Sequence, residues 1–195
     1  MAAYRIEPDA VQWGVVLGAS LAAAILDVRT RRIPNSLTLP LAVGGLVYAA
    51  WTSGIIGLGE SAAACLLLAL PYVILFAVAG GGAGDAKMMG AIGAWLGLRA
   101  GIVVLVAVAI TGGVFGLLRI LAARERGTAL SRLYAWLYVA AIAVSGGRQG
   151  WALLKSEPGE EKKERNEGLR LTIPYGPAIF IGACIGAWVV HSWIG

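Results

Sequence analysis

Long runs of hydrophobic residues, separated by short polar or glycine-rich stretches, dominate the pattern along this chain. The runs that are long enough to cross, or nearly cross, a hydrocarbon core of about 30 Å cover residues 10–27, 37–52, 60–80, 87–98, 100–121 and 172–194. The fourth run is short, and the glycines between residues 97 and 101 favour a tight turn or a kink. The pattern predicts an all-α fold: a polytopic membrane helix bundle with about six transmembrane helices.

Composition places this bundle in a lipid bilayer. Hydrophobic residues make up 58% of the chain and charged residues 14%, with a mean hydropathy of +0.77, far from the balance of a water-soluble domain. The first run ends at the charged segment "DVRTRR" rather than at a small-residue cleavage site, so we interpret it as a retained span. A length of 195 residues leaves no room for a second soluble domain of ordinary size, which predicts a single membrane-embedded domain over residues 1–195.

The basic residues predict how the chain is oriented. With the "RTRR" loop in the cytoplasm, fourteen of the sixteen Lys and Arg residues fall on the inner side, and only Arg5 and Arg99 fall outside. The net charge of +5 is therefore interpreted as a topology signal, and no nucleic-acid partner is expected.

Two segments between the last two spans carry no predicted chemistry. Residues 131–145 are short for a span and are flanked by arginine, which favours an interfacial helix and leaves a seventh span open. Residues 146–170 mix acidic and basic residues with glycine and proline, as is typical of a mobile loop, here placed in the cytoplasm.

Two of the three aspartates lie at the inner ends of spans, where a carboxylate needs compensation. Asp27 closes the first span and Asp85 follows the third. One hypothesis is that they are structural, Asp27 pairing with Arg29 or Arg31 and Asp85 with Lys87. The other is a catalytic dyad, in which one ionised carboxylate activates a water and the other, protonated, polarises a peptide carbonyl.

The glycine-rich stretch "GGGAGDAK" fits the second hypothesis. Without side chains, its glycines, Gly82 and Gly84 among them, permit unusual backbone angles and close approach of an extended peptide to Asp85.

Three ordered motifs resemble those of type IV prepilin peptidases. "GAGD" at Gly82–Asp85 is similar to the GxGD signature of membrane aspartic peptidases, with Lys87 following; "DVRTRRIPN" at Asp27–Asn35 resembles the segment after the first catalytic aspartate, and "IPYGPAI" at Ile173–Ile179 the last-span motif.

The resemblance implies a bacterial inner-membrane, multi-pass aspartic endopeptidase whose active site faces the cytoplasm. It implies that Asp27 and Asp85 are catalytic and that the partner is a prepilin or pseudopilin whose short basic leader is removed. The chain lacks the N-terminal domain with paired CxxC motifs of bifunctional members, so it resembles the short form associated with Flp-type tight-adherence pili. N-methylation is therefore not expected, and neither a metal nor an organic cofactor is implied.

Other residues of these motifs have a structural and a functional interpretation. Lys87 either tunes Asp85 or extends to the interface. Pro34 and Asn35 either bind substrate or end the loop, with Asn35 or Ser36 as N-cap. Pro174 and Tyr175 either shape a substrate groove or form an ordinary proline-bearing helix start.

Two alternative functions stay open at this point. A protease of the signal-peptide-peptidase or presenilin type shares GxGD, but it places its first aspartate in a Tyr-Asp pair, whereas Leu26 precedes Asp27 here. A proton-coupled transporter also uses intramembrane carboxylates, but the chain shows no second half that mirrors the first. The sequence identifies neither the particular prepilin nor the oligomeric state.

Overall fold

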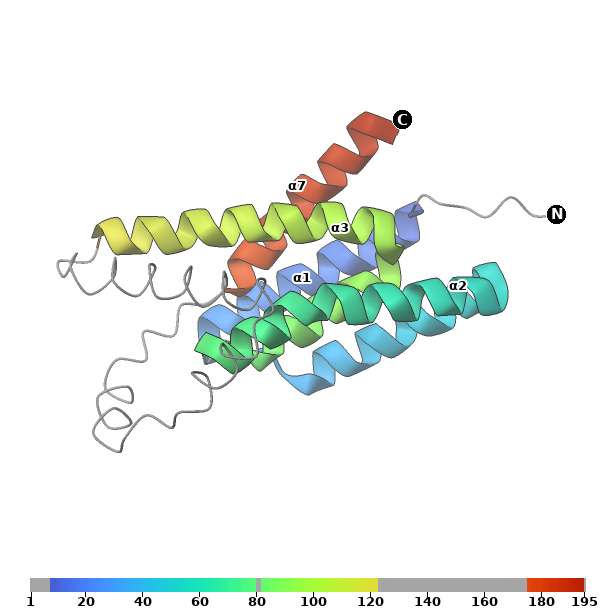
Figure 1. Cartoon of the computed structure of the whole chain (residues 1–195), viewed down its shortest axis with the longest axis horizontal. Helices are drawn as coiled ribbons and strands as arrows, with labels where there is room; N and C mark the ends of the chain where they lie inside the picture. The colour runs from blue at the N-terminus through green and yellow to red at the C-terminus, as the bar shows by residue number, and fades with distance from the viewer. Residues whose placement is uncertain (1–7, 80–81, 123–174, 195) are drawn as a thin grey trace, which may run out of the picture. The chain divides into compact units, whose positions relative to one another are not determined.

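The computed structural model describes residues 8–79, 82–122 and 175–194, and every element in these ranges is a helix. The elements are α1 (Ala10–Thr30), α2 (Asn35–Ala79), α3 (Ala83–Ala122) and α7 (Gly176–Ile194) (Figure 1). By length and composition, α1, α2 and α3 can each cross a membrane, and residues Gly176–Ser192 of α7 form a shorter apolar helix. The all-helical prediction is confirmed. The predictions for residues 131–145 and 146–170 lie outside the described residues.

Both ends of α1 are set by local hydrogen bonds. Asp9 is the N-cap in a capping box: its carboxylate accepts the Gln12 N–H at 2.9 Å, and the Gln12 side chain accepts the Asp9 N–H at 2.8 Å. At the other end Arg31 adopts the left-handed conformation with φ 53° and donates its N–H to the Asp27 carbonyl at 2.8 Å. The helix therefore continues one turn beyond the predicted boundary at residue 27.

Each of the two long helices bends back on itself at a glycine. As straight helices, the 45 residues of α2 and the 40 of α3 would measure about 68 and 60 Å, roughly twice the hydrocarbon thickness. Gly54, with φ 63° and ψ −152°, and Gly97, with φ 70° and ψ −173°, interrupt them. Positive φ at these positions favours glycine. The predicted kink between residues 97 and 101 is confirmed at Gly97.

The contacts between α2 and α3 establish these reversals. Before Gly54, the chain runs parallel to the start of α3: Ile33 lies against Gly84, and a Cβ on Gly45 would meet the Ala94 carbonyl carbon at 2.8 Å.

After Gly54, α2 runs antiparallel to the start of α3, because later residues of α2 contact earlier residues of α3. The Ser61 hydroxyl donates to the Ala94 carbonyl at 2.8 Å, and the later residue Cys65 lies against Gly90, where a Cβ would meet its carbonyl oxygen at 3.2 Å. We therefore distinguish a first and a second arm of α2 (residues 35–53 and 55–79) and of α3 (residues 83–96 and 98–122), which run in opposite directions in Figure 1.

Small residues let these helices pack closely. A Cβ on Gly93 would meet the Ala64 carbonyl oxygen at 2.5 Å. The second arm of α3 also packs on α7, because the Thr111 hydroxyl lies 3.0 Å from the Ala178 carbonyl. The core around the first arm of α3 is apolar and includes the fully buried Met88, Met89 and Ile92.

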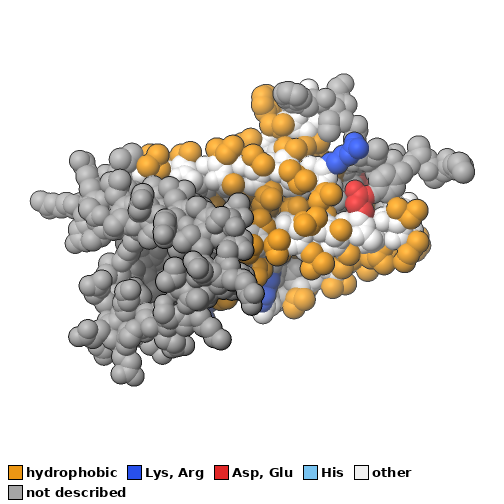
Figure 2. Space-filling model, in the orientation of Figure 1, with side chains coloured by type: hydrophobic (Ala, Val, Ile, Leu, Met, Phe, Trp, Pro, Cys, Tyr) orange, Lys and Arg blue, Asp and Glu red, His pale blue; other side chains and the backbone are white. Residues whose placement is uncertain are grey.

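The surface of the described helices is hydrophobic rather than polar. Large apolar side chains point outward on α1, α2, α3 and α7, with Trp51 88% and Ile55 80% exposed. Figure 2 shows hydrophobic side chains along the visible helices and few charged ones. Apolar surface of this extent is typical of a protein surrounded by lipid.

The close contact at Gly93 gives a stability prediction. Gly93→Ala should destabilise the protein by about 1–3 kcal/mol, because its methyl group must displace the backbone of Ala64. Gly113→Ala is the matched control in the same helix, since nothing lies within 4 Å of its Cβ position. Thermal melting of the two variants in detergent should show a lower midpoint for Gly93→Ala only; equal midpoints would contradict the packing.

Candidate active site

Asp27 is a buried carboxylate near the end of α1. Its side chain is 5% exposed and lies on the buried face of the helix that also carries Ala23 and Ala24. Its Oδ2 atom accepts the backbone N–H of Gly176 at 2.7 Å. The approach is close, since a Cβ on Gly176 would stand 2.8 Å from the Asp27 Cβ. The first turn of α7 therefore supplies a hydrogen-bond donor to Asp27.

The ion-pair hypothesis for the two aspartates is wrong for the described residues. Arg29 and Arg31 are exposed, and Asp27 bonds to the backbone of Gly176 rather than to either guanidinium. Lys87 donates from Nζ to the Asn35 Oδ1 atom at 2.8 Å and does not bridge to Asp85. Neither carboxylate therefore forms an ion pair with the charged side chains nearest to it in sequence.

Asp85 lies in the first turn of α3 and is half-buried. Its N–H donates to the Gly82 carbonyl at 3.1 Å, which starts the helix. The structure brings its carboxyl group close enough to that of Asp27 for the two charges to interact. Asp27 and Asp85, 58 positions apart in the sequence, therefore come together from α1 and α3.

Gly82 and Gly84 do not have the unusual backbone angles that the sequence suggested, and Gly80 and Gly81 lie outside the described residues. Neither Gly82 nor Gly84 has a positive φ; among the described glycines only Gly54 and Gly97 do. Gly84 instead gives room to Ile33, whose Cβ would lie 3.0 Å from an added Cβ, and Gly82 gives room to the Asp85 carboxylate. These glycines matter for close packing around Asp85.

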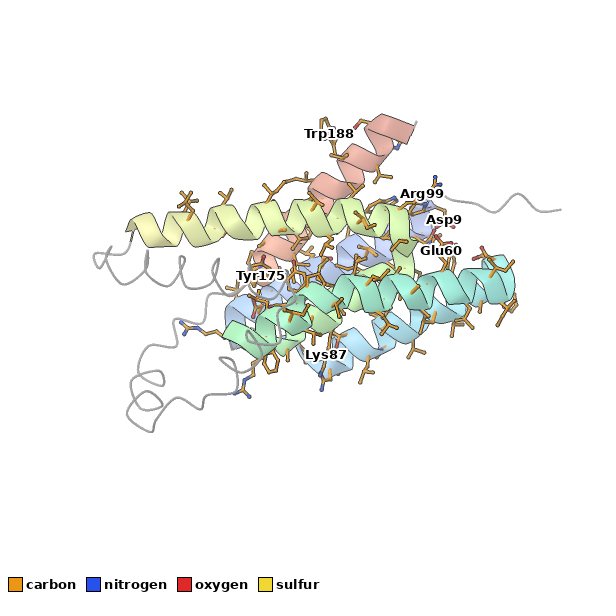
Figure 3. The ribbon with its side chains drawn as sticks, viewed as in Figure 1. Asp9, Glu60, Lys87, Arg99, Tyr175 and Trp188 are labelled. Atoms are coloured by element: carbon orange, nitrogen blue, oxygen red, sulfur yellow. The ribbon has the colours of Figure 1, made fainter. Side chains whose placement is uncertain are left out.

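Tyr175 lies directly before α7, toward the same end of the helices as Lys87 and opposite Asp9, Glu60 and Arg99 (Figure 3). Its hydroxyl group packs on Gly112 of α3, where a Cβ would overlap it. Burial raises the pKa of its phenol, which keeps the group neutral. Asp85 lies within electrostatic range of this phenol. The structure thus places Tyr175 beside the carboxylate pair.

Two residues of this site were missed by sequence reasoning. Tyr72, on the second arm of α2, meets the Tyr175 ring edge-on, with ring centroids 6.1 Å apart. Gly176 lies in the last-span motif "IPYGPAI", in which the sequence analysis considered only Pro174 and Tyr175. The available signal for Tyr72 was a hydroxyl within the apolar run "LPYVILF", because a buried tyrosine hydroxyl usually has a polar partner.

The remaining predicted residues lie at the N-terminus of α2 or outside the residues that the structure describes. Pro34, rather than Asn35 or Ser36, has the N-cap role: α2 begins at Asn35, and the Pro34 carbonyl accepts the N–H groups of Leu37 and Thr38 at 3.1 and 3.4 Å. Proline suits this position because it has no N–H to leave unpaired. Pro174 lies outside the described residues.

Metal-ligating side chains do not gather in the described part of the chain: no group of three His, Cys, Asp or Glu residues is placed to hold an ion there. The described residues bring together two neighbouring carboxyl groups, the Tyr175 phenol and a backbone N–H.

Fold and site together define a helical membrane protein with a paired carboxyl site at one end of its helices. A family model described as the Type IV leader peptidase family matches residues 14–117. The matched region is more than half of the chain and contains both Asp27 and Asp85. The chain belongs to the type IV leader peptidase family.

Curated relatives are similar over part of their length. Proteins named prepilin leader peptidase/N-methyltransferase are 31% identical over 117 residues in Aeromonas salmonicida, 34% over 94 residues in Neisseria gonorrhoeae and 36% over 107 residues in Burkholderia pseudomallei. These alignments cover 54%, 45% and 51% of this chain, but only 40%, 33% and 34% of the relatives. The chain thus matches two fifths or less of each relative. No solved structure matches it.

Proposed function

We propose that this protein is a membrane aspartic endopeptidase that removes the short basic leader of prepilins. One observation carries the proposal: the family-matched region contains two aspartates, and they lie close enough for their charges to interact. Two carboxyl groups in this relation favour different protonation states, because both cannot readily ionise together. The bifunctional names of the relatives include a methyltransferase activity, which we do not extend to this chain.

The proposed reaction is a direct attack of water on the scissile peptide bond. The ionised carboxylate takes a proton from the water as its oxygen attacks the carbonyl carbon, and the protonated carboxyl group donates a hydrogen bond to the carbonyl oxygen. The tetrahedral intermediate then collapses: the C–N bond breaks, the carbonyl re-forms, and the leaving nitrogen accepts the proton that the first carboxylate took from the water. We assign the ionised role to Asp27, because the Gly176 N–H at the start of α7 stabilises a negative charge there.

The proposed substrate is a prepilin of the Flp-like type or a related pseudopilin. Its hydrophobic helix would lie in the bilayer beside the exposed apolar faces of this protein, with the bond to be cut at the level of Asp27 and Asp85. The position of both aspartates at helix ends supports cleavage at the membrane surface rather than within the hydrocarbon.

The proposed topology has six crossings, with the site at the cytoplasmic face of the bacterial inner membrane. The reversals at Gly54 and Gly97 support it, because each arm of α2 and α3 would then be one crossing. The exposed Arg29, Arg32 and Lys87 at the aspartate end support the orientation.

Reporter fusions test this topology. Fusions after Arg32 and Lys87 should read cytoplasmic, and fusions after Gly54 and Gly97 should read external, because one arm separates each pair of neighbouring positions. Equal readings after Lys87 and Gly97 would mean that the first arm of α3 does not cross.

Co-expression with candidate prepilins of the same organism tests the activity. Loss of the leader, seen as a gel shift and confirmed by the mass of the mature N-terminus, is the expected result. The parent chain should cleave, and a chain lacking both carboxyl groups should not. If every candidate prepilin keeps its full length although the protein is abundant and inserted in the membrane, the proposal is overturned.

Membership of the type IV leader peptidase family weighs against both alternative functions. The family match covers the region of both aspartates, and no contact among the described residues favours a signal-peptide-peptidase-like protease or a proton-coupled transporter over prepilin cleavage.

A further inference from the structure

Tyr72 is a buried polar residue that the proposed reaction does not use. It lies on the second arm of α2 and is 8% exposed, among apolar neighbours in sequence. Phe76, one turn later, is 46% exposed and faces outward. The aromatic residue without a hydroxyl thus faces the lipid side, and the one with a hydroxyl is turned inward. A hydroxyl in an apolar interior destabilises the fold unless it has a polar partner.

The polar surroundings of Tyr72 belong to the candidate active site. Its ring meets Tyr175 at an interplanar angle of 68° with centroids 6.1 Å apart, and the two phenol groups lie close enough to interact. Asp85 lies within electrostatic range of both phenols. Three elements therefore meet here: α2 through Tyr72, α3 through Asp85, and the start of α7 through Tyr175.

Tyr175 is confined on a second side by α3. Its hydroxyl end packs on Gly112, whose missing side chain provides the space. Tyr72 contacts the same ring from α2. The Tyr175 phenol thus contacts both α2 and α3 close to Asp85. The next residue in the chain, Gly176, donates its backbone N–H to Asp27.

We propose that Tyr72 is a positioning residue of the peptidase site, which holds the Tyr175 phenol beside Asp85. The inference rests on the proposed function. Tyr72 acts through Tyr175 rather than on the substrate, and its hydroxyl group is the part that matters. The Tyr175 phenol lies within electrostatic range of Asp85 and adds no charge there, and Tyr72 keeps this phenol in place.

The test compares single-atom and whole-ring changes at Tyr72. Tyr72→Phe keeps the ring and removes only the hydroxyl group; we expect kcat for prepilin cleavage to fall about tenfold or more, with KM and the melting temperature unchanged. Tyr48→Phe is the matched control, because Tyr48 donates its hydroxyl to Asp9, at the opposite end of the helices. It should cleave at the parent rate.

A double-mutant cycle separates positioning from direct action. Tyr175→Phe should reduce kcat at least as much as Tyr72→Phe, and the double variant should be no slower than Tyr175→Phe alone, because Tyr72 acts through Tyr175. If the reductions in kcat of the two single variants multiply in the double variant, Tyr72 does not act through Tyr175.

Failure of this inference differs from failure of the proposed function. If the parent and Tyr48→Phe cleave and Tyr72→Phe cleaves equally well, Tyr72 only packs, and the inference is overturned while the peptidase function stands. If the parent chain cleaves no prepilin, the proposed function is overturned, and the inference that rests on it falls too.

Discussion

Asp27→Asn and Asp85→Asn are each expected to lower prepilin cleavage by about 10³-fold or more, while the protein stays folded and inserted. An amide nearly matches a carboxyl group in size, so the packing around both positions is kept. It can neither accept the proton of the attacking water nor offer the acidic proton that polarises the carbonyl. Cleavage of a purified prepilin by purified variants in detergent, followed by gel shift, measures the effect.

The structure explains why these variants should fold. Asp27 accepts one backbone hydrogen bond, from Gly176, and in Asp27→Asn the carbonyl oxygen of the side-chain amide can accept the same bond. Asp85 has no salt-bridge partner among the described residues, so replacing its carboxyl group with an amide leaves no cation unpaired there. Melting temperatures close to that of the parent are expected for both variants.

Asp9→Asn is the matched control, because it makes the same chemical change at the third aspartate. Asp9 caps α1 and accepts the Tyr48 hydroxyl at the opposite end of the helices, and Asn is also a good N-cap. This variant should cleave normally. The double variant of Asp27 and Asp85 should be no slower than either single variant, since half of a dyad is inactive. Cleavage near the parent rate by a folded single variant would contradict the dyad.

The sequence predicts most of the helices because hydrophobic length and glycine position are local properties. The runs at residues 37–52 and 60–80 required a break between them, and Gly54 provides it with a positive φ that glycine adopts readily. The break at Gly97 follows in the same way. Helix starts were less well predicted: α3 begins at Ala83, not near residue 87, so Asp85 and Lys87 lie within its first turns.

The sequence also points to the two aspartates, because carboxyl groups are rare in so apolar a chain. It does not reveal their partners. The donor to Asp27 is a backbone N–H 149 positions away. Because every residue except proline has a backbone N–H, the sequence does not show which one is the donor. Lys87 looked like a partner for Asp85 because it is two positions away, but residues i and i+2 do not face each other on a helix. Its actual partner, Asn35, comes from another helix.

Tyr72 was missed for a related reason. A single tyrosine in an apolar run fits either lipid contact or burial, and only the packing of α2 against the start of α7 decides between them. Its edge-on contact with Tyr175 joins positions that no local pattern relates.

Gly176→Ala should reduce prepilin cleavage by about a hundredfold, although Gly176 has no side chain and no unusual backbone angle. A Cβ there would stand 2.8 Å from the Asp27 Cβ, 3.0 Å from the Ala24 Cα and 3.1 Å from the Ala23 carbonyl oxygen. Two of these atoms are backbone, so α7 must move away from α1. The 2.7 Å hydrogen bond to Asp27 would then lengthen or break.

Gly186→Ala is the control that separates this effect from general loss of packing in α7. Its Cβ would meet Val104 Cγ2 at 2.6 Å, a similar clash in the same helix but about three turns from Gly176. Both variants should melt below the parent, because each overpacks a helix contact. Only Gly176→Ala should lose cleavage at a temperature where both are folded, since a displacement of about 1 Å at a catalytic group can reduce the rate a hundredfold. Equal activity of the two folded variants would show that the Gly176 N–H does not orient Asp27 for the reaction.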